Sequence, residues 1–204
     1  MVGGDISLIP AYEQAGDQWF DADGNVIPDL ITFLHDEAGW TSARVRLMVD
    51  PTQDSDPGTC QNLDYVKQLG RRIKEAGMLF LLDIFYSDTW TDPAQQWIPQ
   101  SWNMDKATAT NVLADKVREY TIESINALVE AGATPDFVQI GNEVSYGMLW
   151  DNLSAKDESR HVVYLDPKWF TYEKQEAQIV RLASLLGAAA EGVRASDAKD
   201  ARII

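Results

Sequence analysis

The sequence predicts an α/β fold, a (β/α)8 TIM barrel of which residues 1–204 supply about the first four βα units and the start of strand five. Three observations lead to this prediction. Strand-like and helix-like segments alternate, which is typical of a parallel sheet flanked by helices. Residues 78–84 form a continuous apolar run, as in a strand covered on both faces. Long segments follow the expected strands and short turns precede them, which favours a barrel with one functional rim.

The first part of the chain predicts two strands separated by a helix. Residues 5–9 have the composition of a short strand, and a loop rich in turn residues follows. Residues 28–37 carry apolar side chains at helical spacing, and Pro28 suits the first turn of a helix. Residues 43–49 alternate as a strand does, and Pro51 ends the pattern. These segments predict the first β-α-β unit.

The middle of the chain predicts two further helices around the apolar strand. Asn62 can cap a helix over residues 63–76, and Gly77 suits its end. The apolar strand over residues 78–84 comes next, followed by a long loop. Residues 107–131 then have a strongly helical composition. The order again indicates parallel strands with helices outside the sheet.

The last part of the chain predicts a fourth strand, a helix and the opening of a fifth strand. Residues 137–140 favour a strand, and an irregular stretch follows. A helix is expected from about Trp169 or Thr171 to Ala190, and residues 200–204 resemble the start of a strand. A complete barrel typically needs ~250 residues or more. We therefore expect the chain to be the N-terminal part of a single (β/α)8 catalytic domain.

The composition of the chain excludes some classes of binding partner. A formal net charge of −15 argues against binding to nucleic acid or to an anionic membrane surface. No run of 18 apolar residues is present, so no membrane span is predicted. Residues 1–4 lack the basic and apolar segments of a signal peptide, which leaves open a cytoplasmic protein or one whose signal has been removed.

Metal-binding patterns are missing from the sequence. His35 and His161 lie far apart, and Cys60 has no neighbouring Cys or His with ligand spacing. No Asp-rich calcium loop is present either. We predict neither a metal nor a cofactor in this chain.

The pair Asn142-Glu143 follows the strand over residues 137–140 directly. In barrels of this type the chemistry lies where strands end. Glycoside cleavage needs two carboxylates, one of which protonates the leaving oxygen while the other attacks the sugar carbon in retaining enzymes. Glu143 is a candidate proton donor if its surroundings raise its pKa, and Asn142 can hydrogen-bond a sugar hydroxyl. The simpler alternatives are a solvated loop carboxylate and an ordinary turn residue.

Arg44 and Arg46 are two positions apart on a strand and therefore share a face. Two arginines that point into a barrel are costly unless they meet anions. One interpretation is that they support a functional carboxylate. The other is a structural ion pair with Asp83, Glu143 or another acid.

Several further side chains surround the expected strand ends. Asp83 and Asp88 flank the end of the apolar strand and can orient substrate or neutralise the arginines, although Asp88 also suits a turn. Aromatic rings in the following loops can lie against the faces of pyranose rings. About half of these tryptophans are expected in the core, because Trp is usually well buried. The four are Trp90, Trp97, Trp102 and Trp150.

Five groups of residues carry a resemblance to a known family. They are residues 4–7, residues 44–46 with Pro51, residues 77–83, residues 86–90 with Asp92, Pro93 and Gln96, and residues 139–143 with residues 147–150. With these segments in order, the chain resembles the endo-β-1,4-galactanases of glycoside hydrolase family 53, a retaining family with a (β/α)8 fold.

The resemblance implies an enzyme that cleaves β-1,4-galactan and arabinogalactan side chains of pectin. It implies Glu143 as the general acid/base, Asn142 as a contact to a sugar hydroxyl, and the two arginines as supports for the nucleophile. It also places Asp83, Tyr86, Asp88, Trp90 and Trp150 on the substrate side. We expect a secreted, periplasmic or cell-surface monomer.

Two departures from the family pattern limit the resemblance. Phe85 stands where the family usually has His, which leaves open a related glycosidase for another β-linked glycan. The family's nucleophile ends strand seven, beyond this chain, so residues 1–204 alone are expected to be inactive. A non-catalytic, sugar-binding half-barrel is the remaining alternative.

Overall fold

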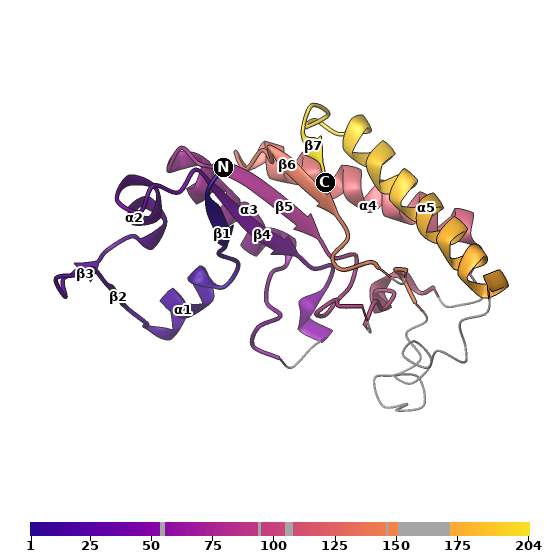
Figure 1. Cartoon of the computed structure of the whole chain (residues 1–204), viewed down its shortest axis with the longest axis horizontal. Coiled ribbons are helices and arrows are strands. Elements are labelled where there is room, and N and C mark those ends of the chain that lie inside the picture. Colours follow the sequence, from indigo (N-terminus) through magenta and orange to yellow (C-terminus); the bar gives the residue numbers. More distant parts are fainter. Residues whose placement is uncertain (54–55, 94, 105–107, 146, 151–171) are drawn as a thin grey trace.

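The computed structural model describes residues 1–53, 56–93, 95–104, 108–145, 147–150 and 172–204. Its main feature is a five-stranded sheet in the order β1-β4-β5-β6-β7, in which every neighbouring pair is parallel (Figure 1). The strands are Gly3–Asp5 (β1), Ser42–Leu47 (β4), Leu79–Ile84 (β5), Phe137–Ile140 (β6) and Arg202–Ile203 (β7). This confirms the predicted parallel sheet, in which consecutive strands are neighbours as in a barrel wall.

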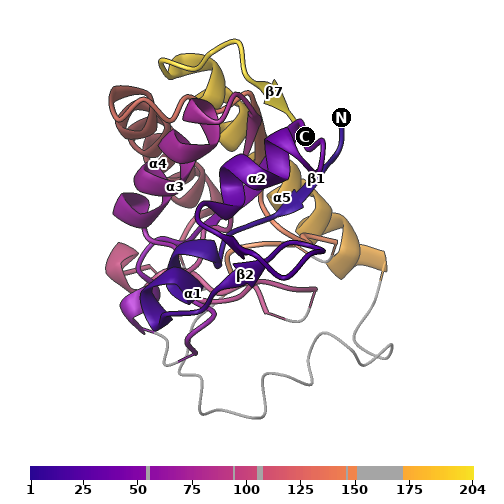
Figure 2. The same cartoon turned by 90° about the vertical axis from the view of Figure 1, so that its left-hand side faces the viewer.

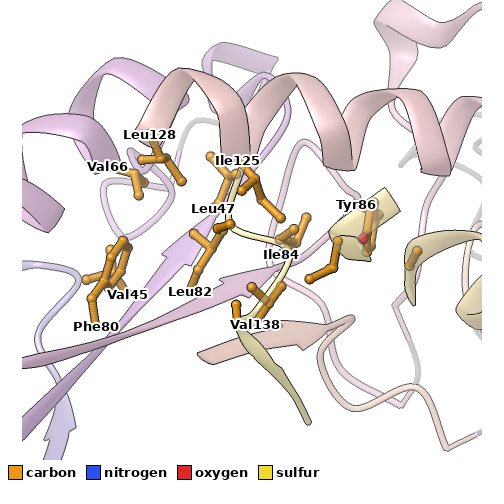
Figure 3. Close-up of a cluster of buried hydrophobic side chains, with 14 of the residues drawn as sticks. Val45, Leu47, Val66, Phe80, Leu82, Ile84, Tyr86, Ile125, Leu128 and Val138 are labelled. Carbon is orange, nitrogen blue, oxygen red and sulfur yellow. The ribbon is translucent and has the colours of Figure 1, made fainter. Parts of the chain in front are cut away.

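Three long helices connect these strands and pack against one face of the sheet (Figures 1 and 2). They are α3 (Leu63–Glu75), α4 (Thr110–Glu130) and α5 (Tyr172–Ala195). Figure 3 shows alternate strand residues, among them Val45, Leu82 and Val138, in one buried cluster with Ile125 and Leu128 of α4. All five side chains are fully buried. Since side chains alternate along a strand, the intervening positions must face the opposite side of the sheet.

The N-terminal region differs from the prediction of a strand over residues 5–9. β1 ends at Asp5, and α1 spans Ile9–Ala15 with Pro10 in its first turn. Proline is favoured there because the backbone N–H groups of the first turn have no acceptor within the helix, so the N–H that proline lacks is not missed. The loop that follows contains an antiparallel pair, β2 (Trp19–Phe20) with β3 (Val26–Ile27).

The helix boundaries follow from their capping residues. The Asn62 side chain accepts a hydrogen bond from Tyr65 N at 2.9 Å, as expected of the cap of α3. Gly77 has φ of 81° and directly follows the C-cap residue of α3. The predicted cap at Asn62 and the predicted helix end at Gly77 are therefore both confirmed. Asp29 caps α2 (Leu30–Asp36), so the helix starts after Pro28 rather than at it.

Some of the expected helix starts fall outside the described segments. Ala107 lies outside the described residues, as do the expected helix starts at Trp169 and Thr171. α5 extends to Ala195 rather than ending at Ala190, because its last turns still pack on the core through buried Val193. Short 3-10 turns span Pro51–Gln53 (η1) and Gln100–Trp102 (η2). Among the described helices, none combines the length and apolarity needed to cross a membrane.

Candidate active site

The candidate site is built on the face of the sheet opposite the helices. Arg44 and Arg46 occupy the intervening positions of β4, and Asp83 does so on β5. In the sheet register Arg44 lies beside Asp5 and Arg46 lies beside Asp83. Charged side chains from three adjacent strands are therefore brought to one layer, near the carboxyl ends of the strands.

Arg44 joins this layer to the pair that follows β6. Its Nη1 donates to Asp5 Oδ2 at 2.5 Å, and its Nη2 donates to Asp83 Oδ2. The same Nη2 lies 3.0 Å from Asn142 Oδ1. One guanidinium group thus fixes two carboxylates and one amide from three other strand ends. The interpretation of the arginines as members of structural ion pairs is confirmed, with Asp83 and Asp5 for Arg44 and with Asp5 for Arg46.

Asp83 is fully buried, and one of its oxygens has no partner among the described residues. Burial raises the pKa of Asp83 to about 7, and the nearby Asp5 charge acts in the same direction. Arg44 and Arg46 act in the opposite direction, but their attraction does not fully offset the loss of hydration. Asp83 is therefore a carboxyl group that changes its charge near neutral pH.

Arg46 connects the charged layer to an aromatic ring. Its guanidinium carbon lies 4.8 Å from the centroid of the Trp90 ring, and its Nη2 lies 3.5 Å from Asp5 Oδ1. Trp90 keeps 45% of its surface exposed. Phe85 is buried and meets Trp90 edge-on, with ring centroids 6.0 Å apart. Phe85, which stands where the family usually has His, therefore supports an exposed ring in the site.

Asn142 and Glu143 sit in a tightly held turn after β6. Asn142 Nδ2 donates to Thr91 O at 2.7 Å, while its Oδ1 accepts from Arg44. Glu143 has φ of 52°, a left-handed conformation that is uncommon for a residue with a side chain. Glu143 is exposed, and no ion pair joins its carboxylate to either arginine within the described part of the chain.

Gln96 is a site residue that local sequence patterns did not single out. Its Nε2 donates to Asn142 O at 2.7 Å and lies 3.4 Å from Glu143 O. Gln96 is one of the residues that carry the resemblance to the family. Its contact is made across 46 positions of sequence, so no nearby capping or turn pattern could have indicated it.

Two of the predicted substrate-side residues lie apart from this cluster. Tyr86 is buried, and its hydroxyl lies 2.8 Å from Thr121 Oγ1 of α4, within the core drawn in Figure 3. Asp88 is also buried and accepts from Asp50 N at 3.0 Å and from Gln100 N at 2.8 Å. Tyr86 therefore joins the chain after β5 to α4, and Asp88 holds loops together, which agrees with its interpretation as a turn residue.

The loop tryptophans divide as expected. Trp102 and Trp150 are each 8% exposed, whereas Trp90 is open to solvent and Trp97 is intermediate. Trp97 and Trp150 meet edge-on with ring centroids 6.2 Å apart. Trp150 therefore joins the loop after β5 to the loop after β6, and half of the four rings belong to the core.

Potential metal ligands are not clustered in the described residues, where no group of three or more His, Cys, Asp or Glu side chains could hold an ion. His35 lies on α2, and its Nδ1 is 2.8 Å from Trp40 O. His161 lies outside the described residues. Cys60 is a free thiol, and burial raises its pKa.

The sequence profile of glycosyl hydrolase family 53 matches residues 1–204. The chain belongs to this family. It is 38% identical over 148 residues to an arabinogalactan endo-beta-1,4-galactanase of Humicola insolens, covering 72% of this chain and 41% of the relative. It is 37% identical over 170 residues to a Niallia circulans protein described only as lying in the bgaB 5′ region, covering 83% of this chain and 43% of the relative.

Solved structures agree with the family 53 assignment. One chain from a study of two fungal beta-1,4-galactanases has a TM-score of 0.76 at 33% identity, covering 98% of this chain and 51% of that chain. The Ignisphaera aggregans GH53 catalytic domain has a TM-score of 0.65 at 28% identity, with coverages of 91% and 48%. The present chain therefore spans about half the length of its family 53 relatives and supplies part of a (β/α)8 barrel, as predicted.

Proposed function

We propose that the full-length protein containing residues 1–204 is a retaining endo-β-1,4-galactanase that acts on galactan and arabinogalactan, with Glu143 as its general acid/base. The observation that carries the proposal is the placement of Glu143. It is exposed at the carboxyl end of β6, beside an amide that Arg44 ties to Asp83, in a family 53 chain. A relative named as an arabinogalactan endo-beta-1,4-galactanase supports the substrate class.

In the proposed mechanism Glu143 acts twice. It first protonates the oxygen of the departing sugar while a second carboxylate attacks the anomeric carbon and forms a covalent glycosyl-enzyme. The family resemblance assigns that nucleophile to a later strand of the barrel. Glu143, now ionised, then removes a proton from the water that releases the sugar, and so regains its own proton.

Asn142 is oriented so that it can contact the substrate. Arg44 donates to the amide oxygen, which fixes the direction of the amide group. One of the two Nδ2 hydrogens is used by Thr91 O, and the second is available for a sugar hydroxyl. Such a contact to the 2-hydroxyl strengthens in the transition state of glycoside cleavage. Arg44 and Asp83 thus serve the proposed site through Asn142.

Trp90 is the proposed stacking surface for a galactose ring. One side of its ring is near Arg46, its edge is supported by Phe85, and the remaining surface is exposed. Trp150, which is mostly buried, contributes by holding the loops rather than by presenting a broad face. We assign Tyr86 and Asp88 supporting roles as well, Tyr86 through its contact with α4 and Asp88 through the loop N–H groups that it accepts from.

The domain organisation, the oligomeric state and the location of the full-length protein belong to the same proposal. Residues 1–204 would form the N-terminal part of a single catalytic domain, which the family 53 match over all of them supports. The full-length protein would be a monomer that reaches its polysaccharide outside the cytoplasm, because galactan is a cell-wall polymer. Size-exclusion chromatography and cell fractionation would test these two points.

Replacing the proton donor is the direct test. Glu143→Gln in the full-length protein should lower kcat on galactan by about 10²–10⁴, the usual contribution of general acid catalysis. Glu130→Gln, at the far end of α4, is the matched control and should keep wild-type turnover. An unchanged rate in Glu143→Gln would exclude Glu143 as the donor.

A second candidate function keeps the chemistry and changes the glycan. The observation in its favour is Phe85, which supports Trp90 where the family pattern has a hydrogen-bonding His. Parallel assays on galactan, arabinogalactan, xylan and mannan decide between the two. Turnover confined to xylan or mannan would replace the galactanase proposal, and no hydrolysis of any of them would favour a sugar-binding protein.

A further inference from the structure

We propose that Gln96 is a positioning residue for the proton donor, because its side-chain amide donates to the carbonyl oxygen of the peptide between Asn142 and Glu143. This inference rests on the proposed role of Glu143 and deepens it. Gln96 acts through the backbone, since its own side chain is 2% exposed and is enclosed by protein.

The contacts of Gln96 converge on main-chain oxygens. Its Nε2 lies 2.7 Å from Asn142 O, 3.1 Å from Asp92 O and 3.4 Å from Glu143 O. A primary amide has two hydrogens, so two of these contacts are full hydrogen bonds and the longest is a weaker, shared one. The amide therefore links the loop after β5 to the turn that carries the proton donor.

The turn needs such a restraint because its backbone is unusual. Glu143 has φ of 52°, and Gly141 just before the pair has φ of 97°. A left-handed conformation costs roughly 1–2 kcal/mol for a residue with a side chain. Without a partner for Asn142 O, the peptide before Glu143 could relax and redirect the carboxyl group. A misplacement of about 1 Å can cost ~10²-fold in rate.

Gln96 is itself held firmly enough to act as a restraint. Its main-chain oxygen accepts from Trp150 N at 2.5 Å, and Ile98 N donates to Trp150 O at 2.8 Å. On the other side, Thr91 O accepts from the Asn142 side chain. Thr91 and residues 95–98 thus contact the chain both at the proton-donor turn and at Trp150, seven residues after Glu143. Gln96 therefore lies where hydrogen bonds join two loops.

The decisive variant is Gln96→Met, which keeps the length of the side chain and removes its donors. In the full-length protein, kcat/KM is measured on galactan and on a 2,4-dinitrophenyl β-galactobioside. The dinitrophenolate leaves without a proton, so its release does not need the acid. We expect kcat/KM on galactan to fall about 10–100-fold and kcat/KM on the aryl glycoside to fall less than about 3-fold.

Two reference variants make the result interpretable. Gln95→Met removes an amide that donates to Trp90 O at 3.0 Å on the same loop, and it should leave the ratio of the two kcat/KM values as in wild type. Glu143→Ala should show the same preference for the aryl glycoside as Gln96→Met, but larger. If Glu143→Ala loses activity equally on both substrates, the proposed function fails; if only Gln96→Met does so, the positioning role is overturned.

A conservative replacement gives an independent readout. Gln96→Glu keeps the shape of the side chain and, when protonated, has one O–H donor for Asn142 O. Relative to wild type at the same pH, its galactan activity should recover as the pH is lowered, while Gln96→Met should not recover. This comparison applies even if Gln96→Met folds poorly, and an equal deficit of Gln96→Glu at all pH values would contradict the proposal.

Discussion

At the scale of single residues, the site depends on how burial and charge compete at Asp83. The carboxyl group is fully buried, and one oxygen accepts from Arg44 while the other has no partner among the described residues. Loss of hydration outweighs the two nearby guanidinium groups and brings its pKa to about 7. A single proton on this side chain therefore changes the charge of the network that holds Arg44 and Asn142.

Stability should depend on pH through this residue. The pKa of Asp83 is about 7 when folded, above its ordinary value of 3.8, so the folded protein binds this proton more tightly than the unfolded chain. Its contribution to the free energy of unfolding is complete below about pH 4, falls as pH rises to about 7, and is constant above that. Asp83→Asn should remove this decline in denaturation experiments on the full-length protein between pH 4 and 8. Equal slopes in the two proteins would contradict the assignment.

At the scale of elements, α5 is fitted closely against α4 at a glycine. A Cβ added to Gly192 would lie 2.8 Å from Thr121 Cβ and 2.9 Å from Arg118 O. Thr121 also contacts the hydroxyl of Tyr86, which follows β5. The close crossing of the two helices therefore extends through Thr121 to the strand end where the site begins. A Cβ added to Gly187, in the same helix, would have no neighbouring atom within 4 Å.

These two glycines should respond in opposite directions to the same substitution. Gly192→Ala should lower the free energy of unfolding by about 1–3 kcal/mol, because the new methyl group overlaps α4. Gly187→Ala should raise it by up to about 1 kcal/mol, since alanine favours a helix and meets no neighbour. Urea denaturation of both full-length variants tests the pair. Stabilisation by both substitutions would show that the helices are not in close contact at Gly192.

At the scale of the whole molecule, the two ends of the strands have separate roles. The carboxyl ends carry Asn142, Glu143 and the arginine network, whereas the opposite ends carry contacts that join helices to strands. Asp136, just before β6, accepts from Lys74 Nζ at 2.6 Å and from Phe80 N at 2.8 Å. This division is typical of barrels, in which chemistry and stability occupy opposite rims.

A substitution at the stabilising rim should leave catalysis intact. Asp136→Ala removes the partner of a strand N–H and of an ammonium group, and should lower the free energy of unfolding by about 1–3 kcal/mol. Because the change lies at the other end of β6 from Glu143, kcat on galactan should equal that of wild type below the unfolding transition. A reduced kcat in fully folded Asp136→Ala would mean that the two rims are coupled.

The sequence by itself determined the alternation of strands and helices, the parallel sheet and several helix ends. These features depend on local periodicity and on capping residues such as Asn62 and Gly77, whose preferences act over a few positions. The shared face of Arg44 and Arg46 was equally predictable, because side chains alternate along a strand. The prediction of a strand over residues 5–9 was wrong beyond Asp5. Pro10 favours the first turn of a helix, and α1 begins at Ile9 in spite of the apolar composition of the segment.

Only the tertiary structure decided which of these groups meet. It placed Tyr86 against α4 rather than beside the arginines, and it enclosed Asp83 so that burial raises its pKa. It also brought Gln96 to the carbonyl group of Asn142, 46 positions away. The physical reason is that burial, pKa and long-range hydrogen bonds depend on the packing of neighbours from distant segments, which local sequence preferences do not encode.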